Sequence, residues 1–377
     1  MHPSHSSFHL PQLGLNKQLS EIYLAIILRA MAFSMIGLFV PLYLLREMGL
    51  SLGDVARYYL VWVGVFVVVT LLAMKFACRF GFKKSIFFSV PFDILALGLL
   101  YSLESTGLPY FIPAIAIGVA NGFFWSGFHV HFAASSDKGK RGSEIGLLYA
   151  LAAFFAVLGP LAGSLILTHY GFTMLFAIAS VLLIASIVPL FFSREKHTVC
   201  AFYLGDIAKV FNGREFLAFI GLGMRYILVI VFWPVFIFMA LGTYLSLGII
   251  ASISAVVGAV FTLFVGKLSD KKDRGGLIKI GAFIHAVIFF FRGSVQSFTQ
   301  VLLVDLTSGM SAILADVATD AKFYDRASES GKAAYVVFRE LGLSVGRVIV
   351  LGAVLLTANL AGSFVLGGIG SLLWMLY

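Results

Sequence analysis

Three ionisable residues stand inside long apolar runs of this chain, where a bilayer would surround them. Arg29 and Arg225 each lie well inside such a run, and Asp305 lies inside a third. A charge at this depth costs at least ~2.5–3.5 kcal/mol, so each is expected to bind a substrate or to be paired. Guanidinium groups bind carboxylates and phosphates through two hydrogen bonds, which favours an anionic or polar solute. A structural pair of Arg225 with Asp305 is the competing interpretation.

Further side chains could carry protons across the membrane. Asp93 is a lone carboxylate inside its apolar run, and it is expected either to pair with Arg29 or to carry a coupling proton. Asp305 is a second candidate for the coupling proton, because a carboxylate far from solvent can be neutralised by a proton. His129 closes the fourth apolar run, and imidazole can titrate near neutral pH. A packing role is the alternative for His129.

Aromatic and amide side chains near His129 are candidate substrate contacts. Asn121, Trp125 and His129 recur at intervals of four residues, which places them on one face of a helix. Trp233, in the seventh apolar run, is a further candidate. Most of the other aromatic residues are expected to face lipid or the packed core.

A stripe of carboxylates follows the tenth apolar run. Asp305, Asp316 and Asp320 share one direction, because eleven residues return a helix to within about 20° and the last two are four residues apart. The next run carries the answering charges, at Arg339, Glu340 and Arg347. Asp316 and Asp320 therefore favour a charge-paired seam between neighbouring helices, with a proton relay as the alternative.

The composition requires long membrane-spanning elements to hold these charges. Of the residues, 60% are hydrophobic and 12% are charged, about half the charged fraction of a soluble domain. A span needs about 20 mainly apolar residues, and the continuous runs argue for helices rather than strands. The sequence predicts an all-α integral membrane protein with twelve transmembrane helices, at 21–45, 54–77, 85–104, 109–134, 143–167, 172–193, 215–241, 245–266, 276–294, 297–319, 332–357 and 359–377.

The twelve spans fall into two similar halves. Glu21 opens the first span and Pro41 follows near its end, whereas Glu215 and Pro234 repeat that spacing after the polar middle of the chain. We expect two six-helix bundles related by duplication. The predicted domains are a tail at 1–20, a bundle at 21–193, a central loop with an amphipathic interfacial helix at 194–214, and a bundle at 215–377.

The basic residues orient the chain. Twenty of the 27 lysines and arginines fall on one side of the predicted spans, three fall on the other side and four lie within spans. Cytoplasmic loops carry the excess of positive charge, so both termini are expected in the cytoplasm of a cell membrane. The net charge of +9 sits in short loops between spans, which argues against nucleic acid as a partner.

Two loops resemble the signature loop of the major facilitator superfamily, G-x-x-x-D-[RK]-x-G-[RK]-[RK]. The loop after the eighth span matches it at Gly266, Asp270, Lys271 and Arg274. The loop after the second span keeps Arg79, Gly81 and Lys83, but has Met74 and Cys78 in place of the first glycine and the aspartate. The resemblance implies that these loops latch the two halves together on the cytoplasmic face.

A second motif and one departure bear on the subfamily. The fifth span contains Gly159-Pro160-Leu-Ala-Gly163, which resembles the G-P-x-x-G core of antiporters. The fourth span has Gly118 about where an arginine is usual, which weakens the assignment to drug/proton antiporters. The family's geometry implies that spans 1, 4, 7 and 10 line a central cavity, so Arg29, Arg225 and Asp305 would face it.

These observations predict a secondary active transporter that moves a small solute by alternating access, coupled to protons. The alternatives are proton-driven efflux of amphipathic drugs, a lipid flippase or scramblase, and a non-transporting receptor. The sequence contains no phosphate loop, zinc helix pair or nucleophile elbow, so neither an enzyme nor a bound cofactor or metal is expected. The expected partners are a small molecule, protons and the bilayer, with the protein acting as a monomer.

Overall fold

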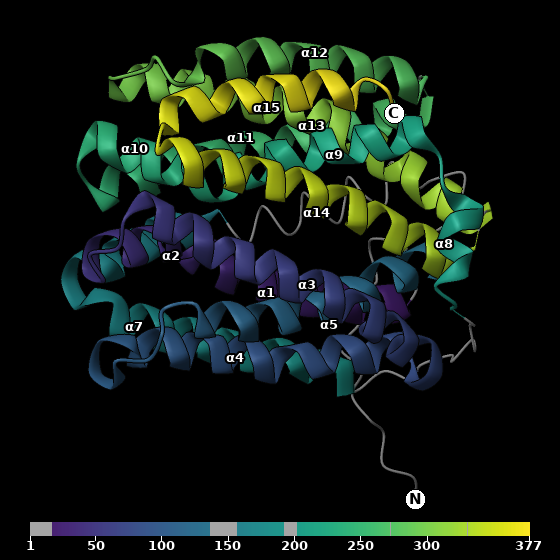
Figure 1. Cartoon of the computed structure of the whole chain (residues 1–377), viewed down its shortest axis with the longest axis horizontal. Coiled ribbons are helices and arrows are strands. Elements are labelled where there is room, and N and C mark those ends of the chain that lie inside the picture. The colour runs from purple at the N-terminus through teal and green to yellow at the C-terminus, as the bar shows by residue number, and fades with distance from the viewer. Residues whose placement is uncertain (1–16, 136–156, 192–201, 272, 330) are drawn as a thin grey trace, which may run out of the picture.

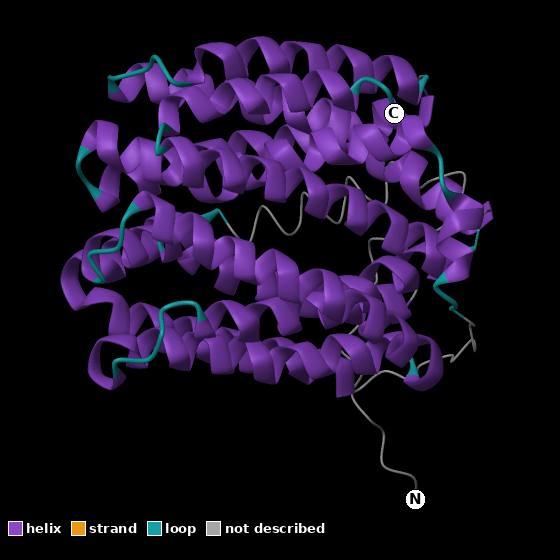
Figure 2. Cartoon of the chain, in the orientation of Figure 1, coloured by secondary structure: helices purple, strands orange, loops and turns teal. Residues whose placement is uncertain are grey.

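The protein is helical throughout its described part. The computed structural model describes residues 17–135, 157–191, 202–271, 273–329 and 331–377. Within these ranges the chain forms helices and no strands (Figure 2). Nine described segments are long and apolar enough to cross a membrane, and α15 (Leu360–Trp374) is a shorter apolar helix. The predicted all-α membrane fold is confirmed, although the predicted span 143–167 begins outside the described residues.

The first half of the chain forms the lower bundle in Figure 1. Its elements are α1 (Lys17–Ile36), α2 (Val40–Leu42), η1 (Tyr43–Glu47), α3 (Leu52–Phe80), α4 (Phe82–Thr106), α5 (Ile112–Ser135) and α7 (Leu158–Phe191). Helix α1 packs along α7, and α4 packs along α5. Gly171 divides α7 into two helices, because its φ of 73° is a left-handed conformation that glycine adopts without strain.

The second half forms the upper bundle in Figure 1. Its elements are α9 (Gly213–Ile227), η2 (Leu228–Phe232), α10 (Trp233–Leu241), α11 (Tyr244–Lys271), α12 (Arg274–Arg292), α13 (Phe298–Glu329), α14 (Lys332–Thr357) and α15. The short helix α8 (Gly205–Val210) lies in the predicted central loop. Helix α9 packs against α14 and α15, and the halves meet where α3 contacts α14 and α7 contacts α11.

The opening helix of each half carries the same irregularity. The π-helical turn η1 follows Pro41, and the π-helical turn η2 precedes Pro234. Both prolines stand in the first turn of an α-helix, α2 and α10, where a missing N–H costs no intrahelical hydrogen bond. Each half therefore opens with a proline and a π-helical turn close together in the chain, in opposite order.

The helix ends define two ends of the molecule. We name the end with the α3–α4 and α11–α12 turns the basic end, because the lysines and arginines of those loops gather there. It lies on the right of Figure 1, where α8 is also drawn. The opposite end carries the α4–α5 and α10–α11 turns.

Aromatic contacts join the halves at the opposite end. The rings of Phe39 and Tyr244 have centroids 6.2 Å apart, and the guanidinium of Arg46 lies 5.2 Å from the centroid of Phe238. The hydroxyl of Tyr244 also donates to Glu47 Oε1 at 3.3 Å. These contacts hold η1 against α10 and α11.

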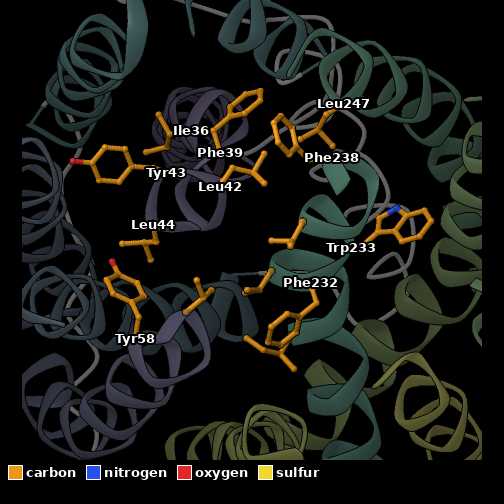
Figure 3. Close-up of a cluster of buried hydrophobic side chains, with 14 of the residues drawn as sticks. Ile36, Phe39, Leu42, Tyr43, Leu44, Tyr58, Phe232, Trp233, Phe238 and Leu247 are labelled. Atoms are coloured by element: carbon orange, nitrogen blue, oxygen red, sulfur yellow. The ribbon is translucent and has the colours of Figure 1, made fainter. Parts of the chain in front are cut away.

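A buried apolar cluster lies between the two halves near this end (Figure 3). Ile36, Phe39 and Leu42 reach into it from the first half. Phe232 and Phe238 reach it from the second half. None of these side chains is more than 6% exposed, so this side of the interface is packed and dry.

Glycines allow α9 and α14 to approach to backbone contact. A Cβ atom on Gly346 would lie 2.0 Å from the carbonyl oxygen of Ile220, and one on Gly223 would lie 1.9 Å from that of Leu343. Small residues at such positions let membrane helices pack closely. Gly352, on the same helix as Gly346, has no atom within 4 Å of the equivalent position.

We expect Gly346→Ala to destabilise the second bundle by about 1–3 kcal/mol, because the added methyl group meets backbone that cannot rotate away. Gly352→Ala is the matched control on α14 and should leave stability unchanged or slightly increased, since alanine favours helix. Thermal unfolding of the purified protein in detergent measures both. Equal melting temperatures for the two variants would contradict the close approach of α9 and α14.

Candidate functional site

The charges predicted inside the first half are paired with each other. Both terminal nitrogens of the Arg29 guanidinium, on α1, donate to the carboxylate of Asp93 on α4. Nη1 donates to Oδ2, and Nη2 lies 3.2 Å from Oδ1. The two side chains are 7% and 0% exposed, respectively. The guanidinium also lies 4.1 Å from the ring centroid of Phe124 on α5. Of the two expectations for Asp93, the structure shows the pair with Arg29, and three helices meet at it.

The space beside this pair is small. A cavity of about 10 Å³ is lined by Arg29, Ile86, Phe124 and Ser186 together with neighbouring apolar side chains. This volume is about the minimum that one water molecule needs. A molecule larger than water could therefore reach Arg29 only if the surrounding helices moved apart.

Asp305 is the centre of a second cluster, in the other half. It accepts hydrogen bonds from Trp233 Nε1 at 2.7 Å and from the hydroxyl of Ser254. Arg292 Nη2 lies 3.5 Å from Asp305 Oδ1, and its guanidinium lies 4.0 Å from the centroid of Trp233. Two of the predicted substrate contacts, Trp233 and Asp305, are thus brought together. Arg292, which the sequence did not single out, is 1% exposed.

The predicted pair of Arg225 with Asp305 is wrong. Arg225 Nη2 lies 2.6 Å from Asp316 Oδ1, and the hydroxyl of Tyr226 donates to the same oxygen. Position along a helix does not give the direction of a side chain. The Arg225 side chain points to Asp316, which lies eleven residues after Asp305 on α13. Asp316 therefore pairs with α9.

The rest of the predicted seam joins α13 to α14. Arg339 Nη2 lies 3.0 Å from Asp320 Oδ1, and Arg339 Nη1 lies 3.2 Å from Glu340 Oε1. Arg347 Nη2 stands 4.0 Å from the second oxygen of Glu340. Positive and negative charges alternate along this row, so each carboxylate is neutralised by an arginine.

The predicted face of α5 points partly at this seam. His129 is 4% exposed and lies between Tyr324 and Arg339 of the second half. Trp125 stacks on the imidazole with centroids 5.2 Å apart, while its outer surface stays 39% exposed. Asn121 lies two helical turns away, towards the opposite end, and is half-buried.

The predicted latch residues hold the turns at the basic end. Arg274 pairs with Asp325 of α13 and approaches Asp270 to 4.0 Å. Gly81 joins α3 to α4 with a φ of 109°, a conformation that explains the glycine. Gly266 and Lys271 lie on α11, and the side chain of Lys271 lies outside the described residues. In the first half, Arg79 packs over Phe80 and Lys83 is buried.

The glycine-proline motif lies where α7 meets both α1 and the other half. A Cβ atom on Gly163 would lie 2.4 Å from the carbonyl oxygen of Met35 on α1. The backbone N–H of Leu161 donates to the hydroxyl of Ser252 on α11 at 3.1 Å. The motif thus permits close packing within its own half and one hydrogen bond to the other half.

Three side chains of these clusters were not predicted from sequence. Arg292 stands near the end of an apolar run, where hydropathy does not distinguish a buried side chain from a solvated one. Ser254 gives no signal, since a lone serine in a membrane helix is common. Tyr324 lies four residues after Asp320, so the carboxylate stripe extended by one turn would have pointed to it.

We expect Arg29→Gln to cost about 3–5 kcal/mol of stability, because it leaves the Asp93 carboxylate buried without a counter-ion. Arg29→Gln combined with Asp93→Asn removes both charges and should recover most of that loss. Arg57→Gln, in an exposed pair with Asp54, is the control and should leave stability nearly unchanged. Thermal unfolding in detergent measures all three, and a double variant no more stable than Arg29→Gln would contradict the pairing.

Several curated proteins are similar to this chain in sequence. The uncharacterized protein YqgE of Bacillus subtilis is 24% identical over 343 residues, which cover 85% of this chain and 78% of that protein. Multidrug resistance protein MdtG of Citrobacter koseri is 29% identical over 188 residues, which span 48% of this chain and 45% of that protein. MdtG of Salmonella schwarzengrund is 25% identical over 332 residues, 80% of each chain.

Solved structures share the fold. The E. coli fucose:proton symporter FucP superposes with a TM-score of 0.68 at 12% identity, covering 95% of this chain and 97% of that one. The human organic anion transporter MFSD10 gives a TM-score of 0.70 at 12% identity, covering 96% and 99%. The family model described as Major Facilitator Superfamily matches residues 22–349. This multi-pass membrane protein, with its paired intramembrane charges, belongs to the Major Facilitator Superfamily.

Proposed function

We propose that this chain moves a small anionic or polar solute across the cell membrane together with a proton. The observation that carries the proposal is the buried pair of Arg29 and Asp93. Asp93 already has a tethered cation and no exposed side-chain surface. A proton on Asp93 removes its charge and frees the guanidinium of Arg29 to bind an acceptor group of the solute.

This pair sets the relation between solute and proton. A solute with a carboxylate or another strong acceptor needs Arg29 free, so it binds when Asp93 is protonated. Proton and solute then occupy the site together and cross together, which is symport. A cationic solute would instead have to displace the guanidinium of Arg29 from Asp93. This is unfavourable because Arg29 belongs to the same chain and stays beside the carboxylate.

The cluster around Asp305 offers the solute a second point of contact, in the second half of the chain. Its carboxylate holds Trp233, Ser254 and Arg292 in one place, with the Trp233 indole stacked on Phe236. Aromatic rings beside paired charges suit a solute that has both an apolar and a polar part, and Trp233, which is 3% exposed, would meet such a solute once the helices move apart. We place the basic end in the cytoplasm, because the positive charges of the loops gather there.

Efflux of amphipathic drugs by proton antiport is the second candidate. The similarity to proteins named MdtG and the glycine-proline motif of α7 favour it. In this mechanism a cationic drug and a proton compete for Asp93 instead of binding together. The two candidates therefore predict proton movements of opposite sign.

We expect solute addition to purified protein in liposomes to move protons, as reported by a trapped pH-sensitive dye. Organic acids, sugars and cationic dyes would be added outside in turn. Under symport the lumen becomes acidic as the solute enters, whereas under antiport the lumen becomes alkaline. Asp93→Asn should abolish the proton movement in either case, because the amide cannot take up the proton.

Asp206→Asn is the matched control, since Asp206 is a carboxylate on α8 that pairs with Lys209 at the surface. This variant should keep the wild-type signal. Solute uptake by the wild type with no change in lumenal pH would contradict proton coupling. A wild-type proton signal in Asp93→Asn would contradict the role of Asp93.

A further inference from the structure

Buried polar side chains join the two halves at the basic end. His129 of α5 belongs to the first half, whereas Tyr324 of α13 and Arg339 and Glu340 of α14 belong to the second. The imidazole Nδ1 lies 2.8 Å from Tyr324 Oη, and Nε2 lies 3.2 Å from Arg339 Nη1 and 3.6 Å from Glu340 Oε1. None of the four residues is more than 5% exposed. We name these four residues the His129 lock.

The partners of His129 fix its protonation state. A guanidinium has only donors, so the nitrogen facing Arg339 must present a lone pair. Nε2 is therefore unprotonated, and the proton sits on Nδ1, which donates to the hydroxyl of Tyr324. The contact between the halves requires the neutral imidazole with this one tautomer.

The charges around the imidazole balance only when it is neutral. Arg339 and Arg347 carry two positive charges, and Asp320 and Glu340 carry two negative charges. Tyr226 of α9 donates its hydroxyl proton to Asp316 and so adds no charge. The residues packed on His129 from its own helix, Trp125 and Phe128, carry no charge.

We propose that His129 is a proton-operated switch that holds the halves together when neutral and releases them when protonated. A proton on Nε2 removes its hydrogen bond with Arg339 and sets a cation against the guanidinium. It also leaves a net positive charge in a buried site. Separation of α5 from α13 and α14 lets water solvate the imidazolium. Arg339 stays paired with Asp320 and Glu340 in the second half.

The switch deepens the proposed proton coupling by naming a proton-dependent conformational step. It differs from Asp93, which lies within the first half and pairs with Arg29 of α1. A failure of solute-coupled proton transport would remove the role of Asp93 but leave the pH response of the lock. The experiment therefore measures conformation without solute.

The test is the separation between the halves at the basic end as a function of pH. Nitroxide labels on non-canonical side chains replace Lys84 and Lys267, exposed residues of the first and second halves, so the native cysteines stay in place. Pulsed electron paramagnetic resonance on the full chain in nanodiscs gives the distribution of distances between the two nitroxides. It is recorded at about pH 8 and about pH 5, on either side of the ordinary pKa of imidazole. We expect the ratio of separated to closed form to rise on acidification, by up to about tenfold per pH unit for one proton.

His129→Gln keeps an acceptor for Arg339 but cannot be protonated, so the closed form should persist at both pH values. Tyr324→Phe removes one hydrogen bond and should shift the population towards separation at both values while keeping the pH response. His285→Gln is the matched control, because this buried histidine contacts Ser308 and Ser311 within its own half. It should respond as the wild type does.

Two results would overturn the proposal. One is a wild-type pH response in His129→Gln. The other is a shorter distance in acid, which would mean that protonated His129 pairs with Glu340 and tightens the contact. If His129→Gln does not fold, a Tyr324→Phe variant with the wild-type distance distribution at both pH values would overturn it equally.

Discussion

A charge inside a bilayer has no water to solvate it, and this constraint shapes the whole interior of the protein. Each buried arginine therefore meets a carboxylate, and the partner usually comes from another helix. Arg29 ties α1 to α4 through Asp93, and Arg225 ties α9 to α13 through Asp316. In the proposed mechanism the pair of Arg29 and Asp93 also exchanges its partners for a proton and a solute, so stability and function would depend on the same contact.

The two halves are joined differently at their two ends. At the opposite end, Phe39, Phe238 and Tyr244 make aromatic contacts that a proton does not alter. At the basic end, His129 and Arg339 make a contact whose charge depends on one proton. Rocking of two rigid bundles breaks one end while the other stays closed. Under the proposed switch, protonation of His129 biases the equilibrium between the two arrangements through its contact at the basic end.

The sequence predicted the fold well because hydropathy and spacing are regular along a membrane helix. The stripe of Asp316 and Asp320 also emerged from helical periodicity, and the structure places both opposite arginines. Pairing was harder, because depth along a helix does not give the direction of a side chain, and Arg225 meets Asp316 instead of Asp305. Arg292 was missed because a charge at the end of an apolar run has the same pattern whether its side chain turns into the bundle or out to solvent.

The position of each titratable group limits what its proton can do. Asp93 pairs with Arg29 inside its own half, so in the proposed mechanism a proton there would change the charge offered to the solute without disturbing the interface. His129 lies between the halves, so the proposed switch would act on their separation without altering the pair of Arg29 and Asp93. A transporter needs both effects, because solute binding and bundle movement must be linked yet occur in sequence. Placing the two groups on different helices, α4 and α5, in contact with different partners makes such an order physically possible.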